Sequence, residues 1–369
     1  THAFTLPFTA LRATPISPLR LRPFRPQLQS VATKKEEDFR VNTMIPKTSS
    51  LVPHSFSGQV ENAIIEKFGE EGAARVLQSW RLTEQEYEHR QFVGNEDDDP
   101  ETSYNYQHAP SYVPGLTCQN FWNIGDFGWS KKLSKGYNTV RKEFSSVMGD
   151  MTKLQTEGNN VWAGALTDEA SGYGEGWKTL VLMDRGMWDE ANCNMFPKTA
   201  KVIKDSGIPT TEVFFASMKP HSDIKMHSDF TNFVLTSHLA LDIPDNGNNK
   251  CLLTIGNEER QWINGEVMLF DTSIMHNAVN KSDGVRYILM FRLWHPDLTP
   301  IEREALQLIY DCLVLPELLS TDPMLKKEAE ERISELRQFP NLKGNEIISG
   351  FGGGSPKKPG KKKKKKGKR

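Results

Sequence analysis

The spacing of apolar positions changes along this chain and separates helical segments from a strand-rich region. Between residues 57 and 91 the apolar positions approximate a period of 3.6, which predicts helical structure interrupted at Gly69 and Gly72. Three later segments have the pattern of helices: 132–148, 301–319 and 324–336. Thr299 followed by Pro300 is typical of a helix start, so the second of these helices is expected to begin there.

The strand-rich region extends from residue 213 to residue 294. Three runs in it are rich in β-branched and aromatic residues: 265–270, 274–279 and 286–294. Because side chains two positions apart on a strand point to the same face, Arg286 is expected to share a face with Met290 and Arg292. The last run, RYILMFRLW, is apolar enough to be a core strand.

Composition divides the chain into a central domain with appendages, as its 369 residues allow. The predicted parts are a disordered basic arm (1–50), a helical segment (51–94), an acidic linker (95–110), the main domain (111–310), C-terminal helices (311–340) and a disordered lysine-rich tail (341–369). The linker contains the run EDDDPE.

The N-terminal arm has the composition of a targeting segment. Residues 1–33 contain four arginines and no acidic residue, and they are rich in Ser, Thr and Pro. The opening His2-Ala3-Phe4 resembles the cleavage motif of plastid leaders in algae with complex plastids. We therefore expect plastid targeting. An ordinary disordered arm remains an alternative, as do the secretory pathway or ER lumen and the cytoplasm.

The C-terminal tail is strongly basic although the whole chain has a formal net charge of −1. From Ser355 onward it contains nine lysines and Arg369, which suit contact with an anionic surface such as a lipid, a nucleic acid or an acidic partner. A tail that only raises solubility is an equal alternative. No aromatic residue alternates with the lysines, so sequence-specific nucleic-acid binding is not expected.

Two further features limit the class of protein. No apolar run approaches 18 residues, so no transmembrane segment is expected. The four cysteines show neither a C-x-x-C motif nor metal-site spacing, and free thiols are the default expectation, with a disulfide left open.

The candidate chemistry lies in the strand-rich region. His227 and Asp229 are two residues apart, His276 follows, and Arg286 comes ten residues later. Two histidines and one carboxylate are the ligands of non-haem Fe(II) oxygenases, and an arginine can hold a dicarboxylate co-substrate. On one strand His227 and Asp229 would point to the same face, and His276 would arrive from another strand.

Each part of this pattern is weak alone. The chain has nine histidines, and His221 with Asp223 forms a second H-x-D six residues upstream. A single histidine is more often a hydrogen-bonded core or surface residue, so the prediction depends on the combination. Asp271 either orients His276 or caps a turn, and the sequence leaves both roles open.

The same segment resembles the aspartyl/asparaginyl β-hydroxylase family of Fe(II)- and 2-oxoglutarate-dependent dioxygenases. The matching motifs are YVPGL (112–116), H-x-x-x-T-N (227–232), HLAL (238–241), W-x-x-G (262–265), LFD-x-S-x-x-H (269–276) and WHP-x-LTP (294–300). The resemblance extends over about residues 112–309. The resemblance implies a mainly β fold with flanking helices (α+β) around a double-stranded β-helix, or jelly-roll and cupin-like, core.

Carried over by position, the resemblance makes His227 and His276 iron ligands and makes Arg286 and His238 contacts of 2-oxoglutarate. Animal members have glycine at the position of Asp229. The aspartate here completes a facial triad, as in bacterial relatives and most other 2-oxoglutarate oxygenases, so His227, Asp229 and His276 are the predicted metal and catalytic residues.

This sequence departs from the family pattern around the co-substrate. A family serine that contacts it falls at Ala216, so the neighbouring Ser217 is the predicted contact. A helper arginine falls at Thr236, so we expect Arg286 to carry more of the binding. Trp177 aligns loosely with a substrate-side tryptophan.

The resulting prediction is an enzyme of algal or microbial type that uses Fe(II), 2-oxoglutarate and O₂ to hydroxylate an unactivated C–H bond. The expected substrate is an Asp or Asn side chain of a peptide or protein. The alternatives are a lipid or small-molecule hydroxylase of the same family, a cupin enzyme that does not use 2-oxoglutarate, and a cupin-like binding module without catalysis.

Overall fold

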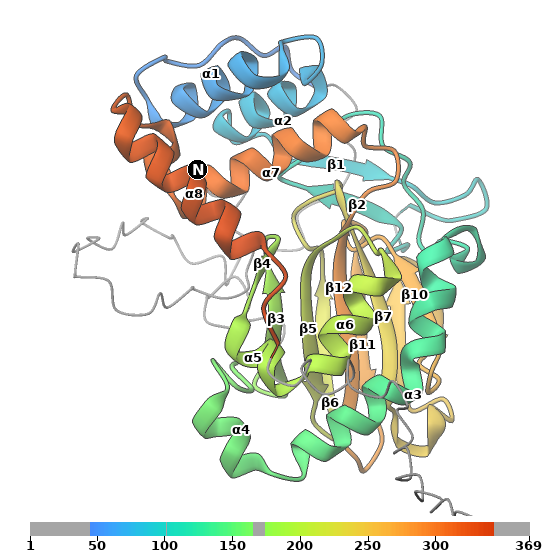
Figure 1. Cartoon of the computed structure of the whole chain (residues 1–369). Helices are drawn as coiled ribbons and strands as arrows, with labels where there is room; N and C mark the ends of the chain where they lie inside the picture. The colour runs from blue at the N-terminus through green and yellow to red at the C-terminus, as the bar shows by residue number, and fades with distance from the viewer. Residues whose placement is uncertain (1–44, 101, 165–173, 343–369) are drawn as a thin grey trace, which may run out of the picture.

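A helical layer lies over one end of two packed β-sheets in the computed structural model, which describes residues 45–100, 102–164 and 174–342 (Figure 1). Almost all of the predicted basic arm and the lysine-rich tail lie outside these residues, so the targeting and anionic-surface predictions stay predictions. Among the described helices none combines the length and hydropathy that crossing a bilayer requires. The four cysteines all lie in the described ranges, and each is a free thiol.

The helical predictions are confirmed with small shifts of their ends, except that the first segment stops being helical at Glu84 rather than at residue 91. The helices are α1 (Phe56–Phe68), α2 (Ala74–Glu84), α3 (Gly128–Met148), α4 (Met151–Glu157), α5 (Glu190–Met195), α6 (Pro197–Ser206), α7 (Pro300–Val314) and α8 (Pro323–Arg337), with 3-10 turns η1 (Ile124–Asp126), η3 (Pro244–Asn246) and η4 (Pro316–Leu319). α7 begins where the sequence indicates. Thr299 accepts from the backbone N–H of Glu302, and the Glu302 side chain accepts from the N–H of Thr299.

The strands form two antiparallel sheets and one separate hairpin. Their bounds are β1 (His89–Phe92), β2 (Tyr106–Ala109), β3 (Trp177–Asp184), β4 (Met187–Trp188), β5 (Thr210–Met218), β6 (Ser222–His227), β7 (Val234–Asp242), β8 (Cys251–Ile255), β9 (Glu258–Gln261), β10 (Val267–Phe270), β11 (His276–Asn280) and β12 (Arg286–Trp294). The larger sheet has the order β10-β7-β12-β5-β3-β4, the smaller β6-β11-β8-β9, and β1 pairs with β2. This is the predicted mainly β fold with flanking helices and a jelly-roll, cupin-like core.

The larger sheet is apolar on both faces because each face has its own cover. Alternate residues of its strands face α3 and α6, which lie across it in Figure 1, and Phe215 and Phe291 belong to this outer cluster. The intervening residues, such as Ala216 and Met290, face the interior between the two sheets. The alternation predicted for the last strand therefore places its even-numbered residues inside the barrel.

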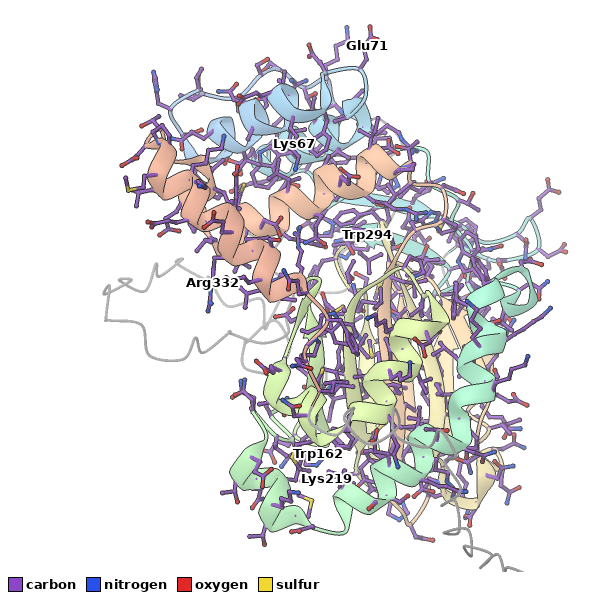
Figure 2. All side chains as sticks on the ribbon, in the orientation of Figure 1. Lys67, Glu71, Trp162, Lys219, Trp294 and Arg332 are labelled. Carbon is purple, nitrogen blue, oxygen red and sulfur yellow. The ribbon has the colours of Figure 1, made fainter. Side chains whose placement is uncertain are left out.

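The helices at the end of the barrel form a second core. α1, α2, α7 and α8 pack together there, and Trp294 at the end of β12 lies at the junction of this layer with the sheet (Figure 2). Trp294 stacks on Tyr310 of α7 with ring centroids 5.8 Å apart. The C-terminal helices are therefore packed onto the barrel through the strand that carries Arg286.

The structure corrects two of the expected segments. β1 occupies the end of the predicted helical segment, and β2 lies inside the predicted linker at residues 106–109. Each of these strands has only four residues, and their polar sequences HRQF and YQHA contain no run of apolar alternation. Their pairing depends on contacts with distant residues, which local periodicity does not report.

Candidate metal centre

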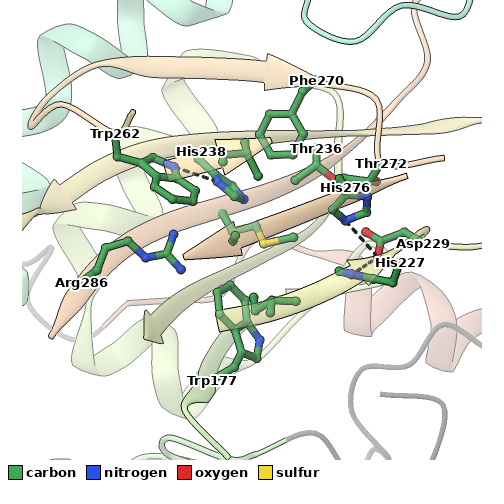
Figure 3. A pocket seen from close by; sticks show the side chains of 14 residues that line it. Trp177, His227, Asp229, Thr236, His238, Trp262, Phe270, Thr272, His276 and Arg286 are labelled. Atoms are coloured by element: carbon green, nitrogen blue, oxygen red, sulfur yellow. Dashed lines mark hydrogen bonds and ion pairs between the residues drawn. The ribbon is translucent and has the colours of Figure 1, made fainter. Parts of the chain in front are cut away.

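Three predicted ligands converge at one end of a pocket between the two sheets. The ligating atoms of His227, Asp229 and His276 all lie within 4.8 Å of one another. Oδ1 of Asp229 is 3.6 Å from Nε2 of His227 and 3.9 Å from Nε2 of His276. Figure 3 shows the three side chains directed toward one another. The structure therefore brings together the set that the sequence indicated.

The local structure around Asp229 differs from the expectation. β6 ends at His227, and Asp229 lies in the following loop rather than on the same strand. Its N–H donates to the carbonyl of Thr272 at 2.8 Å, and the next residue, Phe230, has a φ of 63°. Positive φ is uncommon for a bulky residue and ends the extended backbone. His276 does begin a different strand, and it pairs with His227 in the β6–β11 register.

Both histidines are oriented by backbone carbonyls. Nδ1 of His227 lies 2.7 Å from the carbonyl of Lys225, and Nδ1 of His276 lies 2.8 Å from that of Ile274. Because a carbonyl oxygen only accepts, each Nδ1 must carry a proton, and in the neutral imidazole each Nε2 then has a lone pair facing Asp229. This is the tautomer that a metal ligand needs.

Asp271 has the second of the two roles left open by the sequence. Its Oδ1 accepts from the N–H of Ser273 at 2.8 Å and from the Ser273 hydroxyl at 2.6 Å. The carboxylate therefore caps the turn before His276 and does not bond to the imidazole itself. Burial raises the pKa of Asp271 to about 6, although both Ser273 contacts act in the opposite direction.

Charge at this end is balanced within the protein. Nη1 of Arg292 donates to Oδ2 of Asp229. Burial opposes ionisation of Asp229, but Arg292 and the two histidines outweigh it and hold the pKa of the carboxyl well below its usual value. Burial and the neighbouring His227 lower the pKa of His276 to about 3, so its imidazole is neutral at physiological pH. Neutral imidazoles and an ionised carboxylate are the forms that bind a divalent metal.

The other end of the pocket contains a buried cation. Arg286 is 0% exposed, and its Nη2 lies 3.5 Å from Sδ of Met218. Its Nε and Nη1 have no hydrogen-bond partner among the described residues. The guanidinium stacks on Trp262 at 4.2 Å, and burial lowers its pKa to about 10. A buried cation without an anion is costly, so this position is suited to an anionic ligand.

His238 adds a second donor beside Arg286. Nε1 of Trp262 donates to Nδ1 of His238 at 3.1 Å, so the imidazole proton must lie on Nε2. That Nε2 also has no hydrogen-bond partner within the part of the chain that the structure describes. Burial, together with the Arg286 charge, holds the pKa of His238 well below 6.5. Figure 3 shows Arg286 and His238 across the pocket from the histidine–aspartate cluster.

Ser217 is not brought to the pocket. Its hydroxyl lies 3.4 Å from the carbonyl of Lys178, and strand alternation places it on the outer face with Phe215. Ala216 faces the interior instead, so the position of the family serine contributes only a methyl group. Thr236 does line the pocket, and its hydroxyl lies 3.1 Å from that of Thr272.

The remaining pocket wall is mostly apolar. Besides the residues already described, it is formed by Trp177, Ile224, Leu253, Phe270, Ala278 and Met290. Trp177 also faces Arg286, with 5.4 Å between the guanidinium carbon and the ring centroid. Its predicted place near the site is therefore observed, and the apolar wall limits access of water to the two polar ends.

Sequence reasoning missed a segment that binds both ligand loops. The backbone N–H of Ser111 donates to the carbonyl of Phe230 at 2.9 Å, and that of His108 donates to the carbonyl of Ser273 at 2.8 Å. Asn232 exchanges hydrogen bonds with the backbone of Val113 at 2.8 and 2.9 Å. We call residues 106–113 the strap. The YVPGL motif was its only sequence signal, and that motif does not indicate these contacts.

Known proteins resemble this chain over the region that contains the site. The profile of the family described as aspartyl/asparaginyl beta-hydroxylase matches residues 134–296. The Mus musculus protein of that name is 29% identical over 211 residues, covering 55% of this chain and 27% of the mouse protein. The ornithine lipid ester-linked acyl 2-hydroxylase of Rhizobium tropici is 28% identical over 181 residues, covering 48% of this chain and 62% of that protein.

Solved structures with some likeness include AviO1 from Streptomyces viridochromogenes Tue57, which is 12% identical with a TM-score of 0.29. The match covers 44% of this chain and 87% of AviO1. The family assignment rests instead on the sequence match, which contains the three candidate ligands as well as Arg286 and His238. Over residues 134–296, which include all five of these side chains, the chain matches the aspartyl/asparaginyl β-hydroxylase family.

Proposed function

We propose that the protein is an Fe(II)- and 2-oxoglutarate-dependent dioxygenase that hydroxylates an unactivated C–H bond. The observation that carries this proposal is the arrangement of one pocket. Two imidazoles and a carboxylate meet at one end, and the unpaired donors of Arg286 and His238 lie at the other. A 2-oxo dicarboxylate has matching chemistry, because one end can chelate a metal and the other is an anion.

The metal would be held by Nε2 of His227, Oδ1 of Asp229 and Nε2 of His276. Imidazole and carboxylate ligands suit Fe(II), and three protein ligands leave positions for a co-substrate and O₂. When bound, the iron and 2-oxoglutarate supply the oxidising chemistry, in which O₂ and the 2-oxo acid are consumed and succinate and CO₂ are released with the hydroxylated product. The backbone carbonyls on Nδ1 keep both imidazoles in the ligating tautomer.

The far carboxylate of the co-substrate would be bound by Arg286 and Nε2 of His238. The guanidinium is already buried, so an anion gained there replaces no strong protein contact and meets little competition from water. Trp262 keeps the proton of His238 on Nε2 and packs on Arg286, which orients both donors. These contacts fit the group without the serine and arginine that the family has at positions 216 and 236.

For the substrate we propose an Asp or Asn side chain of a peptide or protein, following the names of the mammalian relatives. The Rhizobium tropici relative, named as an acyl 2-hydroxylase of ornithine lipid, supports a fatty acyl chain as the second candidate. Both are unactivated C–H substrates. The test is to incubate the protein with a peptide or with a lipid and to measure the mass increase of each substrate. Oxygenation of the peptide but not of the lipid would favour the Asp or Asn side chain.

The direct test is an anaerobic titration of the full chain with Fe(II) and 2-oxoglutarate, followed by visible absorption. We expect a saturable metal-to-ligand charge-transfer band that is lost in Asp229→Ala and in His276→Ala. His221→Ala is the matched control, because His221 belongs to the other H-x-D and pairs with Asp283 on the surface. A folded wild-type protein without the band would contradict the proposal and favour the non-catalytic module.

A further inference from the structure

Asp229 is the member of the ligand set that no strand holds. β6 ends at His227, and the chain then turns through Phe230, whose φ is 63°. The N–H of Thr231 donates back to the carbonyl of Asp229 at 2.8 Å, which makes a tight turn over Phe230. These contacts fix the backbone of Asp229. They do not fix the rotation of its carboxylate, which needs a contact of its own.

Arg292 supplies this contact. Its Nη1 donates to Oδ2 of Asp229, and the two side chains are only 5% and 4% exposed. Oδ1 is left facing Nε2 of His227 at 3.6 Å and Nε2 of His276 at 3.9 Å. The two oxygens of one carboxylate therefore have different partners. A charge-assisted hydrogen bond out of water is strong enough to maintain that division.

Arg292 is itself held in place on both sides. It lies on β12 between β5 and β7, where its register partners are Glu212 and Thr236. The hydroxyls of Thr210 and Thr211 donate to the carbonyl of Arg292 at 2.8 and 3.2 Å. The β5–β12 register shifts directly after Arg292, so these hydroxyls support the backbone at an irregular point of the sheet.

We propose that Arg292 is a positioning residue of the metal centre, which presents Oδ1 of Asp229 alone to the ion by occupying Oδ2. This inference rests on the proposed function, because it requires a metal at His227, Asp229 and His276. A carboxylate that binds through one oxygen occupies one coordination position, which keeps the adjacent positions available for the co-substrate. Arg292 on β12 is also the register partner of Thr236 on β7. It therefore supplies a cation next to the position at which the family has its helper arginine.

The test compares two buried arginines on the same face of β12. Co(II) is titrated into the full chain without co-substrate, and its visible absorption gives both the apparent Kd and the ligand environment. We expect Arg292→Gln to weaken Co(II) binding by about tenfold or more and to change the absorption spectrum, as loss of a ligand-orienting contact does. Arg286→Gln is expected to leave the Co(II) Kd within about twofold and to lose 2-oxoglutarate binding instead.

The outcomes separate this inference from the proposed function. A wild-type chain that binds Co(II) together with a folded Arg292→Gln variant of equal affinity and spectrum would overturn the role of Arg292 alone. A folded wild-type chain that does not bind Co(II) would overturn both. If Arg292→Gln does not fold, Arg292→Lys decides, because it keeps the charge and loses the planar fork. Weaker Co(II) binding by the lysine variant supports the inference, and equal binding contradicts it.

Discussion

Trp262 donates its indole N–H to Nδ1 of His238 at 3.1 Å, and so it determines which nitrogen of that imidazole faces the pocket as a donor. The same indole ring lies 4.2 Å from the guanidinium of Arg286. One tryptophan thus orients both groups proposed to bind the co-substrate, a role that its sequence motif does not disclose.

Replacing the indole by a phenyl ring tests this role. In Trp262→Phe the imidazole of His238 can move its proton to Nδ1, and one donor to the co-substrate is lost. We expect the KM for 2-oxoglutarate to rise by about fivefold to tenfold, the value of one net hydrogen bond, with a smaller change in kcat. Trp122→Phe is the control, because Trp122 packs against Phe127 and His295 away from the pocket. An equal change in both variants would contradict the assignment.

Removing the charge of Arg286 is expected to separate stability from binding. In Arg286→Met the buried, unpaired cation disappears while its apolar packing with Trp262 is largely kept, so the ligand-free protein should be as stable as the wild type or more stable by about 1–3 kcal/mol. 2-Oxoglutarate should then give no thermal stabilisation. Unfolding followed with and without the 2-oxo acid measures both effects, and Arg260→Met, at an exposed position of β9, is the control.

Glu212 gives a pH dependence with a defined sign. Burial raises its pKa from 4.5 to about 7, although Arg292 acts to lower it. The unfolded chain therefore releases this proton near pH 4.5 and the folded protein only near pH 7, so the stability associated with Glu212 falls as pH rises across that interval. The free energy of unfolding of Glu212→Gln should lack this pH dependence. Relative to the wild type it should rise by up to about 3 kcal/mol between pH 4.5 and pH 7.

Denaturant unfolding of both proteins between pH 5 and 8 measures the difference. Above pH 7 the two stabilities should run parallel, because the carboxyl is then ionised in both states of the wild type. A constant difference over the whole range would show that Glu212 titrates normally.

His276→Ala tests the metal assignment at the level of turnover. Loss of one imidazole from the three-ligand set is expected to abolish 2-oxoglutarate consumption in the presence of Fe(II), while circular dichroism shows a retained fold. Succinate release reports the turnover. Unchanged succinate release would exclude His276 as a ligand, whereas loss of activity together with loss of structure would require the more conservative His276→Gln.

Strong local patterns made much of the fold predictable. The run 286–294 is β12, and the Thr299–Pro300 start signal is the beginning of α7. β1 and β2 were missed because four-residue polar strands have no periodicity of their own. Their place in the structure comes from pairing with each other and from contacts with ligand loops far along the chain.

The site was predictable in composition and less so in geometry. Ligand order and spacing indicated the two histidines and Asp229, but the strand argument placed Asp229 on β6 when it lies beyond the end of that strand. Ser217 was chosen as the neighbour of Ala216, and a shift of one residue on a strand reverses the face. The same alternation did place Arg292 on the same face of the strand as Arg286, but only the structure showed that its partner is Asp229.

The strap also bears on when the metal centre can form. His108 and Ser228 are 120 residues apart in sequence, and Val113 and Asn232 are 119 apart. Contacts over such separations require closure of long loops, so they are expected to form late in folding. A chain still being synthesised would thus expose its histidines without the geometry to bind the proposed metal well. Metal loading is therefore expected to follow closure of the barrel and not to nucleate it.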